Sequence, residues 1–271
     1  MSPYTPRHLA PADEPTATAP TGTSRRRALA HGLLGVSAVA GAATLGSAAA
    51  SAAPSAGAIH GQDVSGWQGD VDWKAQMAKG SRFAYIKATE GRTYHSPTFS
   101  SQYIGATKAG LVRGGYHFAR PDSGDPIEQC DAFLNGGGGW SDDGITLPGM
   151  LDLEGYPGLP ANYGLSRQDL RTWISDFSNH YRANTPRRPI LYTNLHWWQD
   201  NVGEWTPKNC PLFLASYSSS TPSTLPGRWW GWEMWQYSAS GPFAGDSSVF
   251  FGTETQFERF VSQPDYGAVG I

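Results

Sequence analysis

Two acidic residues, Asp152 and Glu154, stand two positions apart in an apolar segment. If this segment, Gly149–Leu153, is a β-strand, its side chains alternate between two faces. Both carboxyl groups then point the same way, with Cα atoms about 6.5–7 Å apart, and the leucines take the other face. Two neighbouring carboxylates repel unless one holds a proton, and catalysis uses such pairs as acid and base. The alternative is a structural pair whose acids meet an arginine or a helix N-terminus.

Segments of strand length alternate with segments of helix length along the chain. The expected strands are Ile59–Val64, Phe83–Ala88, Val112–Phe118, Gly149–Leu153, Pro189–Thr193, Leu212–Tyr217 and Trp232–Tyr237. The expected helices are Asp72–Lys79, Pro97–Lys108, Pro126–Leu134, Ser166–Arg182 and Thr253–Ser262. Near-continuous apolar strands followed by helices indicate a parallel sheet covered on its outside. With about eight strands and no dinucleotide or phosphate-binding fingerprint, the sequence favours a single-domain α/β barrel with an irregular second half.

Polar residues cluster at the carboxyl ends of the expected strands, where a barrel enzyme carries its site. They are Asp63, Lys87, Glu90, His117, Asp152, Glu154, Asn194, Tyr217 and Gln236. His117 lacks a second histidine at ligand spacing, so a structural or hydrogen-bonding role is expected for it. Lys87 and Glu90 either pair with each other or bind sugar hydroxyls.

The first 58 residues have the pattern of an export signal. Arg25, Arg26 and Arg27 precede a short Gly- and Ala-rich apolar run from Leu33 to Ala43, and small residues follow. The paired arginines indicate the twin-arginine type of signal, which exports folded proteins. We therefore expect residues 59–271 to form the mature domain, and a secreted protein with no membrane contact after the signal is removed.

Charge and composition narrow the ligand class. The chain has 20 Lys and Arg against 23 Asp and Glu, and residues 1–58 hold four of the basic and two of the acidic residues, so the remainder carries net −5. No basic patch remains, which argues against nucleic acid. Eleven Trp and twelve Tyr include the clusters Trp197-Trp198 and Trp229–Trp232. Aromatic rings of this kind either fill a core or stack on sugar rings.

Cys130 and Cys210 are the two cysteines of the sequence. In an exported protein they either form one disulfide or remain free thiols, and the spacing is compatible with both. Without a histidine cluster they give no zinc signature, so neither a metal nor a cofactor is expected.

Seven segments, in this order, resemble the lysozymes of glycoside hydrolase family 25. The segments are Gly61–Gln68, Phe83–Gly91, Gly114–Phe118, Leu151–Glu154, Ile190–Asn194, Leu214–Tyr217 and Trp235–Ser238. The resemblance covers almost all of residues 60–261 and implies an irregular TIM-like (β/α)5(β)3 barrel. It also implies hydrolysis of the β-1,4 bond between N-acetylmuramic acid and N-acetylglucosamine in peptidoglycan.

The resemblance assigns roles to four acids. Glu154 corresponds to the general acid, Asp152 to its partner carboxylate, and Asp63 to a further acid that lines the cleft. Asp246 corresponds to the last acid, because Asp246–Gly252 matches Asp-x-x-x-Phe-x-Gly, although Pro242–Gly245 before it departs from the common pattern. The substrate-binding residues expected beside these acids are Tyr116, Tyr192, Tyr217, Trp235, Gln236 and Lys87.

The close spacing of Asp152 and Glu154 disfavours a widely separated inverting pair. Attack by the sugar's own 2-acetamido oxygen fits better, with Glu154 as acid and Asp152 steadying positive charge. Attack by another carboxylate, Asp63 or Asp246, stays open. Ionised Asp152 is expected to raise the pKa of Glu154.

Two other functions remain open at this point. One is a chitinase-like glycosidase, because Asp-x-Glu on a strand and acetamido assistance also serve chitin. The other is a non-catalytic wall-binding protein of the same fold. The expected partner is the glycan strand of peptidoglycan, and a monomer is the expected state.

Overall fold

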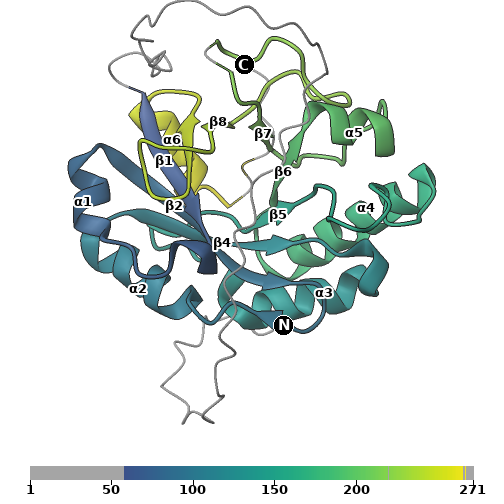
Figure 1. Cartoon of the computed structure of the whole chain (residues 1–271), viewed down its shortest axis with the longest axis horizontal. Coiled ribbons are helices and arrows are strands. Elements are labelled where there is room, and N and C mark those ends of the chain that lie inside the picture. The colour runs from purple at the N-terminus through teal and green to yellow at the C-terminus, as the bar shows by residue number, and fades with distance from the viewer. Residues whose placement is uncertain (1–57, 219, 265, 267–271) are drawn as a thin grey trace, which may run out of the picture. The chain divides into compact units, whose positions relative to one another are not determined.

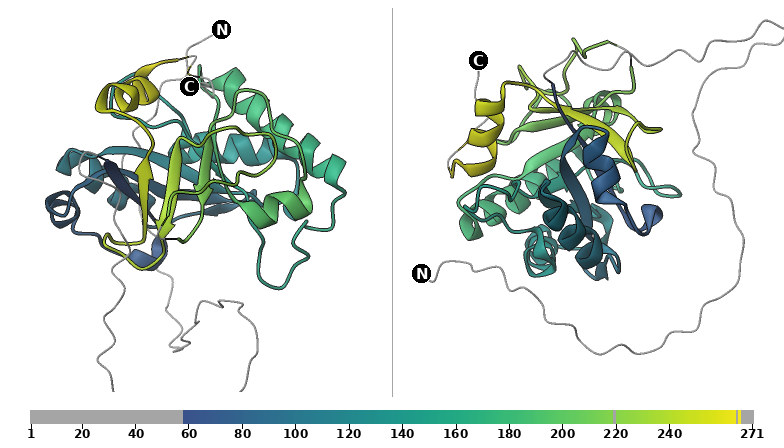
Figure 2. Two further views of the ribbon diagram at one scale, coloured as in Figure 1. Left: turned by 90° about the horizontal axis from the view of Figure 1, so that it is seen from above. Right: turned by 90° about the vertical axis from the view of Figure 1, so that its left-hand side faces the viewer.

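The computed structural model describes residues 58–218, 220–264 and 266 of the 271-residue chain. Within them, eight of nine strands close into a barrel, shown in Figure 1 and, from two further sides, in Figure 2. The strands are β1 Ile59–Val64, β2 Ser81–Glu90, β3 Tyr94–His95, β4 Val112–Phe118, β5 Met150–Asp152, β6 Ile190–Asn194, β7 Leu212–Ala215, β8 Met234–Ser238 and β9 Asp246–Phe250.

The order of the strands explains the irregularity of the barrel. Strands β1, β2, β4, β5, β6, β7 and β8 pair in parallel, each with the next. Strand β9 runs antiparallel to both β8 and β1 and so closes the ring. The short strand β3 forms a hairpin on β2. The structure thus confirms the expected irregular α/β barrel.

Helices cover the barrel on the outside (Figure 1). Their bounds are α1 Trp73–Ala78, α2 Phe99–Ala109, α3 Pro126–Phe133, α4 Arg167–Asn184, α5 Leu195–Asn201 and α6 Glu254–Ser262, with single-turn segments at Gly66–Gln68, Pro121–Ser123 and Leu134–Gly138. Side-chain caps fix several helix starts. Ser166 accepts the backbone N–H of Asp169 at the start of α4, and Thr253 and Gln256 form a capping box at the start of α6. No helix in the described ranges is both long and apolar enough to span a bilayer.

Strand alternation sorts the core into an inner and an outer layer. Inward residues such as Phe83, Tyr85, Met150 and Phe213 fill the barrel, and Phe260 of α6 packs against them. The outward side chains of β5, β6 and β7 pack against α3, α4 and α5, and those of β1 and β2 against α1 and α2. The inner layer leaves the inward positions at the carboxyl ends of the strands to polar groups.

Three elements were not expected from the sequence, namely the two-residue strand β3, strand β9 and helix α5. Strand β9 lies in a segment with no apolar alternation, and α5 begins directly after β6, with Asn194 as its N-cap. Both cysteines are buried free thiols in the outer core, so the open question is answered against the disulfide. The export segment falls outside the described residues, except for Ala58.

Candidate active site

Two of the four acids face each other across neighbouring strands. Asp63 near the end of β1 and Asp246 at the start of β9 are directly opposed in the antiparallel ladder. Gly245 makes this approach feasible. Its φ is +73°, and a Cβ at this position would lie 2.1 Å from the carbonyl oxygen of Asp63. The departure from the common pattern before Asp246 therefore does not move this acid out of the group.

Amide side chains hold the segment before Asp246. Gln62 Nε2 donates to the carbonyl oxygen of Ala244 at 2.9 Å, and Ala244 N donates to Gln76 Oε1 at 2.9 Å. Gln62 and Gln76 are themselves buried. These contacts tie the segment to β1 and α1 and fix the start of β9.

The other two acids have the geometry that the sequence predicts. Asp152 is the last residue of β5, and Leu153 N donates to Tyr192 O, so strand pairing continues one residue further. Asp152 and Glu154 share a side-chain hydrogen bond, while Leu153 is buried in the outer core. Asp152 is 5% exposed and Glu154 is only partly buried, so Glu154 is the more accessible of the two.

Every acid of the group has a raised pKa. Burial raises the pKa of Glu154 to about 7. Burial and the charge of Glu154 raise the pKa of Asp152 well above its usual range. Burial and then Asp246 raise that of Asp63, and burial raises that of Asp246. The Asp152–Glu154 pair consequently retains a proton near neutral pH, as an acid catalyst requires.

The cause of the raised pKa of Glu154 differs from our expectation. Burial is the largest contribution, whereas the hydrogen bond with Asp152 lowers this pKa, as does the charge of Lys87. Burial, and not the charge of Asp152 that the sequence suggested, is therefore the main cause of the raised pKa of Glu154. The hydrogen bond that protonated Asp152 donates favours the ionised form of Glu154, so the two carboxyl groups share one proton.

Gln236 connects one acid to two tyrosines. Its Nε2 donates to Asp63 Oδ2 at 2.8 Å, and its Oε1 accepts the hydroxyls of Tyr192 and Tyr217, each at 2.9 Å. Gln236 and Tyr192 are buried, and Tyr217 is 59% exposed. The amide thus fixes the orientation of Asp63 and presents the ring of Tyr217 to solvent.

Tyr116 and Lys87 also lie in this group. The pKa of the Tyr116 hydroxyl is raised by burial and by all four acids, Asp152 first, which places it among them. Lys87 Nζ is 2.7 Å from Glu90 Oε2 and 4.7 Å from the ring centre of Phe118. Its charge lowers the pKa of both Asp152 and Glu154, so its ion pair with Glu90 leaves it close enough to act on the acids.

Trp235 does not belong to the group. It neighbours Gln236 on β8 and points to the outer face, where it packs against Trp232 and Tyr237 and donates its indole N–H to Ser216 O at 2.7 Å. The structure contradicts the expectation that Trp235 binds substrate beside the acids, because adjacent strand residues face opposite sides.

His117 has the structural role that was expected. It is buried between Thr89, which lies 2.8 Å from Nδ1, and Gln129, which lies 3.1 Å from Nε2. Burial lowers its pKa to about 4, so it stays neutral over most of the physiological range.

Two residues beside the segments that carry Glu154 and Asp63 were not singled out from the sequence. Tyr163 donates its hydroxyl to Glu154 O at 2.6 Å, which holds the backbone that carries the acid. Trp67 follows the end of β1 and is 90% exposed. Trp67 could have been identified from the sequence, because it lies four residues after Asp63 in the segment Gly61–Gln68.

An α/β barrel with four carboxyl groups at one end is an arrangement typical of glycoside hydrolases. The model of the family described as glycosyl hydrolases family 25 matches residues 62–246. The chain therefore belongs to glycosyl hydrolases family 25 and is a glycoside hydrolase of the lysozyme type.

Individual relatives agree with this. An N,O-diacetylmuramidase of Arthroderma benhamiae is 49% identical over 230 residues, which are 84% of this chain and 97% of the relative. An N,O-diacetylmuramidase of Chalaropsis sp is 44% identical over 209 residues, 75% of this chain and 99% of the relative. The solved structure of a family GH25 lysozyme from Aspergillus fumigatus matches with a TM-score of 0.74 and 48% identity, over 76% of this chain and 99% of that one.

Proposed function

We propose that this protein is a muramidase that hydrolyses the β-1,4 bond between N-acetylmuramic acid and N-acetylglucosamine in peptidoglycan. The observation that carries the proposal is the Asp152–Glu154 pair, in which the pKa of Glu154 is about 7 and the two carboxyl groups share a hydrogen bond. Two relatives that are N,O-diacetylmuramidases support this substrate.

Glu154 is the proton donor in this proposal. It is the more accessible acid of the pair and is protonated below about pH 7. It transfers its proton to the glycosidic oxygen as the bond from that oxygen to the anomeric carbon breaks. The resulting carboxylate then takes a proton from the water that attacks the anomeric carbon, which returns Glu154 to its starting state.

Asp152 assists the acetamido group of the bound sugar. The acetamido oxygen attacks the anomeric carbon and forms a cyclic intermediate that carries positive charge. Asp152 lies deeper than Glu154. When the proton that the pair shares is on Glu154, Asp152 is ionised and stabilises this charge. Water opens the ring from the opposite face, so the configuration at the anomeric carbon is retained. The hydrogen bond between the two acids supports a retaining mechanism, because an inverting pair is spaced widely enough to flank a sugar ring.

Asp63 and Asp246 have supporting roles in this scheme. Gln236 orients Asp63, and Asp246 raises the pKa of Asp63, so one of these two acids is readily kept neutral as a hydrogen-bond donor to sugar. Tyr116, Tyr192, Tyr217 and Lys87 complete the substrate-binding group. If an acid of this pair attacks directly instead, a covalent glycosyl-enzyme forms and mass spectrometry of a trapped reaction detects it.

Product analysis tests the substrate class. Purified peptidoglycan and chitin are digested in parallel, and the soluble products are identified by mass spectrometry after borohydride reduction. A muramidase releases fragments with reduced muramic acid at their ends and leaves chitin largely intact. Comparable release from chitin would support the chitinase-like alternative, and binding to the wall without any release would support the non-catalytic alternative.

Export from the cell is part of the same proposal. We infer that residues 1–58 direct secretion by a twin-arginine route and that residues 59–271 act outside the cell as a monomer free of the membrane. Replacing Arg25 and Arg26 with lysine should retain the protein inside the producing cell, measured by immunoblotting of culture supernatant. Unchanged secretion by this variant would contradict the twin-arginine assignment.

A further inference from the structure

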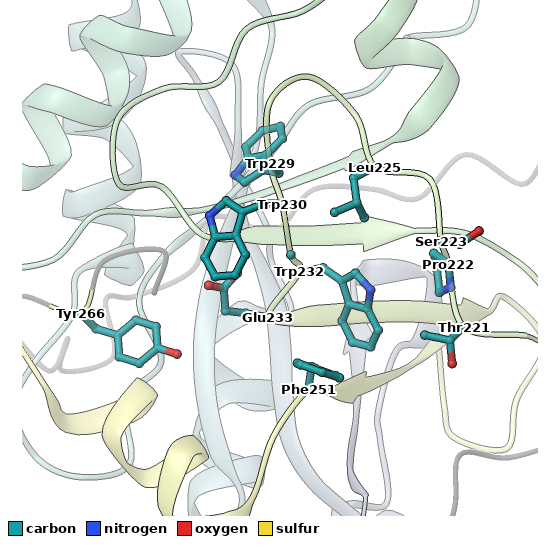
Figure 3. A pocket seen from close by; sticks show the side chains of 11 residues that line it. Thr221, Pro222, Ser223, Leu225, Trp229, Trp230, Trp232, Glu233, Phe251 and Tyr266 are labelled. Atoms are coloured by element: carbon teal, nitrogen blue, oxygen red, sulfur yellow. The ribbon is translucent and has the colours of Figure 1, made fainter. Parts of the chain in front are cut away.

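A pocket lined by aromatic residues lies outside the group of acids. It has a volume of about 560 Å³, and none of the four acids lines it. Its lining includes Leu225, Trp230, Trp232, Glu233, Phe251 and Tyr266. Figure 3 shows these side chains along β7 and β8, with Tyr266 at one end of the pocket and Thr221–Ser223 at the other. We call this site the aromatic pocket.

The backbone places the aromatic pocket at the outer wall of the barrel. Glu233 N donates to Leu212 O, and Phe251 N donates to Glu233 O, so Glu233 lies between the start of β7 and the end of β9. Trp232 packs against the outward-facing Trp235 at 5.9 Å between ring centres. The acids instead lie at the carboxyl ends of β1 and β5 and at the start of the antiparallel β9. Glu233 precedes β8 and Phe251 follows β9, so these two pocket residues lie at the opposite ends of the strands.

Two rings of the pocket are held in contact with water. Trp230 and Phe251 are each 54% exposed, although both are large apolar side chains. Trp232 is partly buried and contacts Phe251 at 5.0 Å between ring centres. Exposed apolar area gathered in a hollow is typical of a binding surface.

Glu233 adds a polar acceptor to these rings. Its Oε2 accepts the backbone N–H of Leu212 at 2.9 Å, and burial raises its pKa to about 7. Among the described residues no basic side chain forms an ion pair with it. None of the eleven residues that line the pocket is basic. An anionic partner, such as a polyphosphate chain or an anionic lipid surface, therefore finds no countercharge here.

We propose that the aromatic pocket is a second carbohydrate site that binds uncharged N-acetylhexosamine units of a glycan strand. Trp230 and Phe251 stack on the apolar faces of the sugar rings, and Glu233 accepts a hydrogen bond from a hydroxyl or acetamido N–H group. The site holds the enzyme on an insoluble polymer while the acids act on another part of the strand. This inference rests on the proposed glycan substrate but not on the assignment of Glu154.

The test separates retention on the polymer from chemistry. The full chain with Glu154→Gln, which prevents cleavage, is incubated with insoluble peptidoglycan, and the bound fraction is measured over a range of polymer concentrations. We expect the further changes Trp230→Ala and Phe251→Ala to weaken this binding by about tenfold together, which corresponds to about 1.4 kcal/mol. Ile104→Ala on α2, where the side chain is 50% exposed, is the matched control and should leave binding unchanged.

A second measurement uses the active enzyme. Trp230→Ala and Phe251→Ala should slow digestion of insoluble peptidoglycan but leave kcat/KM for short soluble peptidoglycan fragments within about twofold of wild type. Titration with the hexasaccharide of N-acetylglucosamine should shift the indole N–H signal of Trp230 in an NMR spectrum. Unchanged retention of the double variant, or an unperturbed Trp230 signal at saturation, would overturn the inference. If the protein binds the polymer through this pocket and cleaves nothing, the proposed muramidase activity fails while the second site stands.

Discussion

The pKa of Glu154 leads to a specific prediction about pH. Glu154 acts in its protonated form, and burial sets its pKa to about 7. As pH rises through this value the proton is lost, so the active fraction falls. From pH 6 to pH 8 the protonated fraction decreases about tenfold, and kcat/KM should decrease by the same factor. The value of kcat/KM at each pH is measured from the release of reducing ends from soluble peptidoglycan fragments at constant ionic strength. Circular dichroism at each pH confirms that the protein stays folded.

Lys87 provides a variant that tests the same reasoning. Its charge lowers the pKa of Glu154, so Lys87→Met should move the alkaline decline of kcat/KM to higher pH. Lys108 is an exposed lysine on α2, and Lys108→Met serves as the matched control. A folded wild-type enzyme whose kcat/KM is constant or rising between pH 6 and pH 8 would refute the reasoning, as would a shift of the Lys87 variant to lower pH.

Three further substitutions test how the site is built. The pKa of Asp63 is higher in the folded protein than in an unfolded chain, so the folded state loses stability as pH rises through it. Asp63→Asn keeps an oxygen that accepts the hydrogen bond from Gln236. The Tm of this variant at pH 8 should exceed that of wild type by about 2–4 °C, and the gain should be smaller at pH 4. Its activity should be lower than that of wild type. Gly245→Ala would press a Cβ against Asp63 O and should lower the free energy of unfolding by about 2–4 kcal/mol in urea, whereas an unchanged midpoint would contradict the tight approach. Gln236→Leu leaves the hydroxyl of buried Tyr192 and the carboxyl of Asp63 without the hydrogen bonds that Gln236 makes to them. The free energy of unfolding should fall by about 2–4 kcal/mol, and a fall below about 0.5 kcal/mol would mean that these hydrogen bonds contribute little.

The first half of the barrel could be predicted because apolar runs such as Phe83–Ile86 of β2 alternate with segments of helix length. Strands β1 and β4 have the predicted bounds, and the helix starts at Asp72, Ser166 and Thr253 were marked by their capping residues. A strand buried on both faces leaves a clear apolar run, and an N-cap leaves a recognisable side chain. These local signals were sufficient to position Asp63, Asp152 and Glu154.

The closing strand β9 could not be read in the same way. Ser247 and Ser248 are fully buried in it, so the segment has no apolar alternation that would identify it as a strand. Its place is set by pairing with β8 and β1 on both sides, which are contacts between distant parts of the chain. The opposition of Asp246 and Asp63 is a consequence of this pairing and was not visible in the sequence.

The error at Trp235 was avoidable. Trp235 and Gln236 are consecutive residues on one strand, so both cannot face the interior of the barrel. The sequence identified an aromatic residue of the right type near the site, but alternation places it on the outer wall. The main cause of the raised pKa of Glu154 could not be predicted from the sequence, because the extent of burial depends on the packed structure.

The most direct test of the account is digestion of purified peptidoglycan by wild type beside Glu154→Gln, with the products identified by mass spectrometry. The account predicts that wild type releases fragments ending in muramic acid. The variant should release none above the background while keeping the circular dichroism spectrum and Tm of a folded protein. Release by Glu154→Gln at a rate close to that of wild type, or wild-type fragments ending in N-acetylglucosamine, would contradict the central claim.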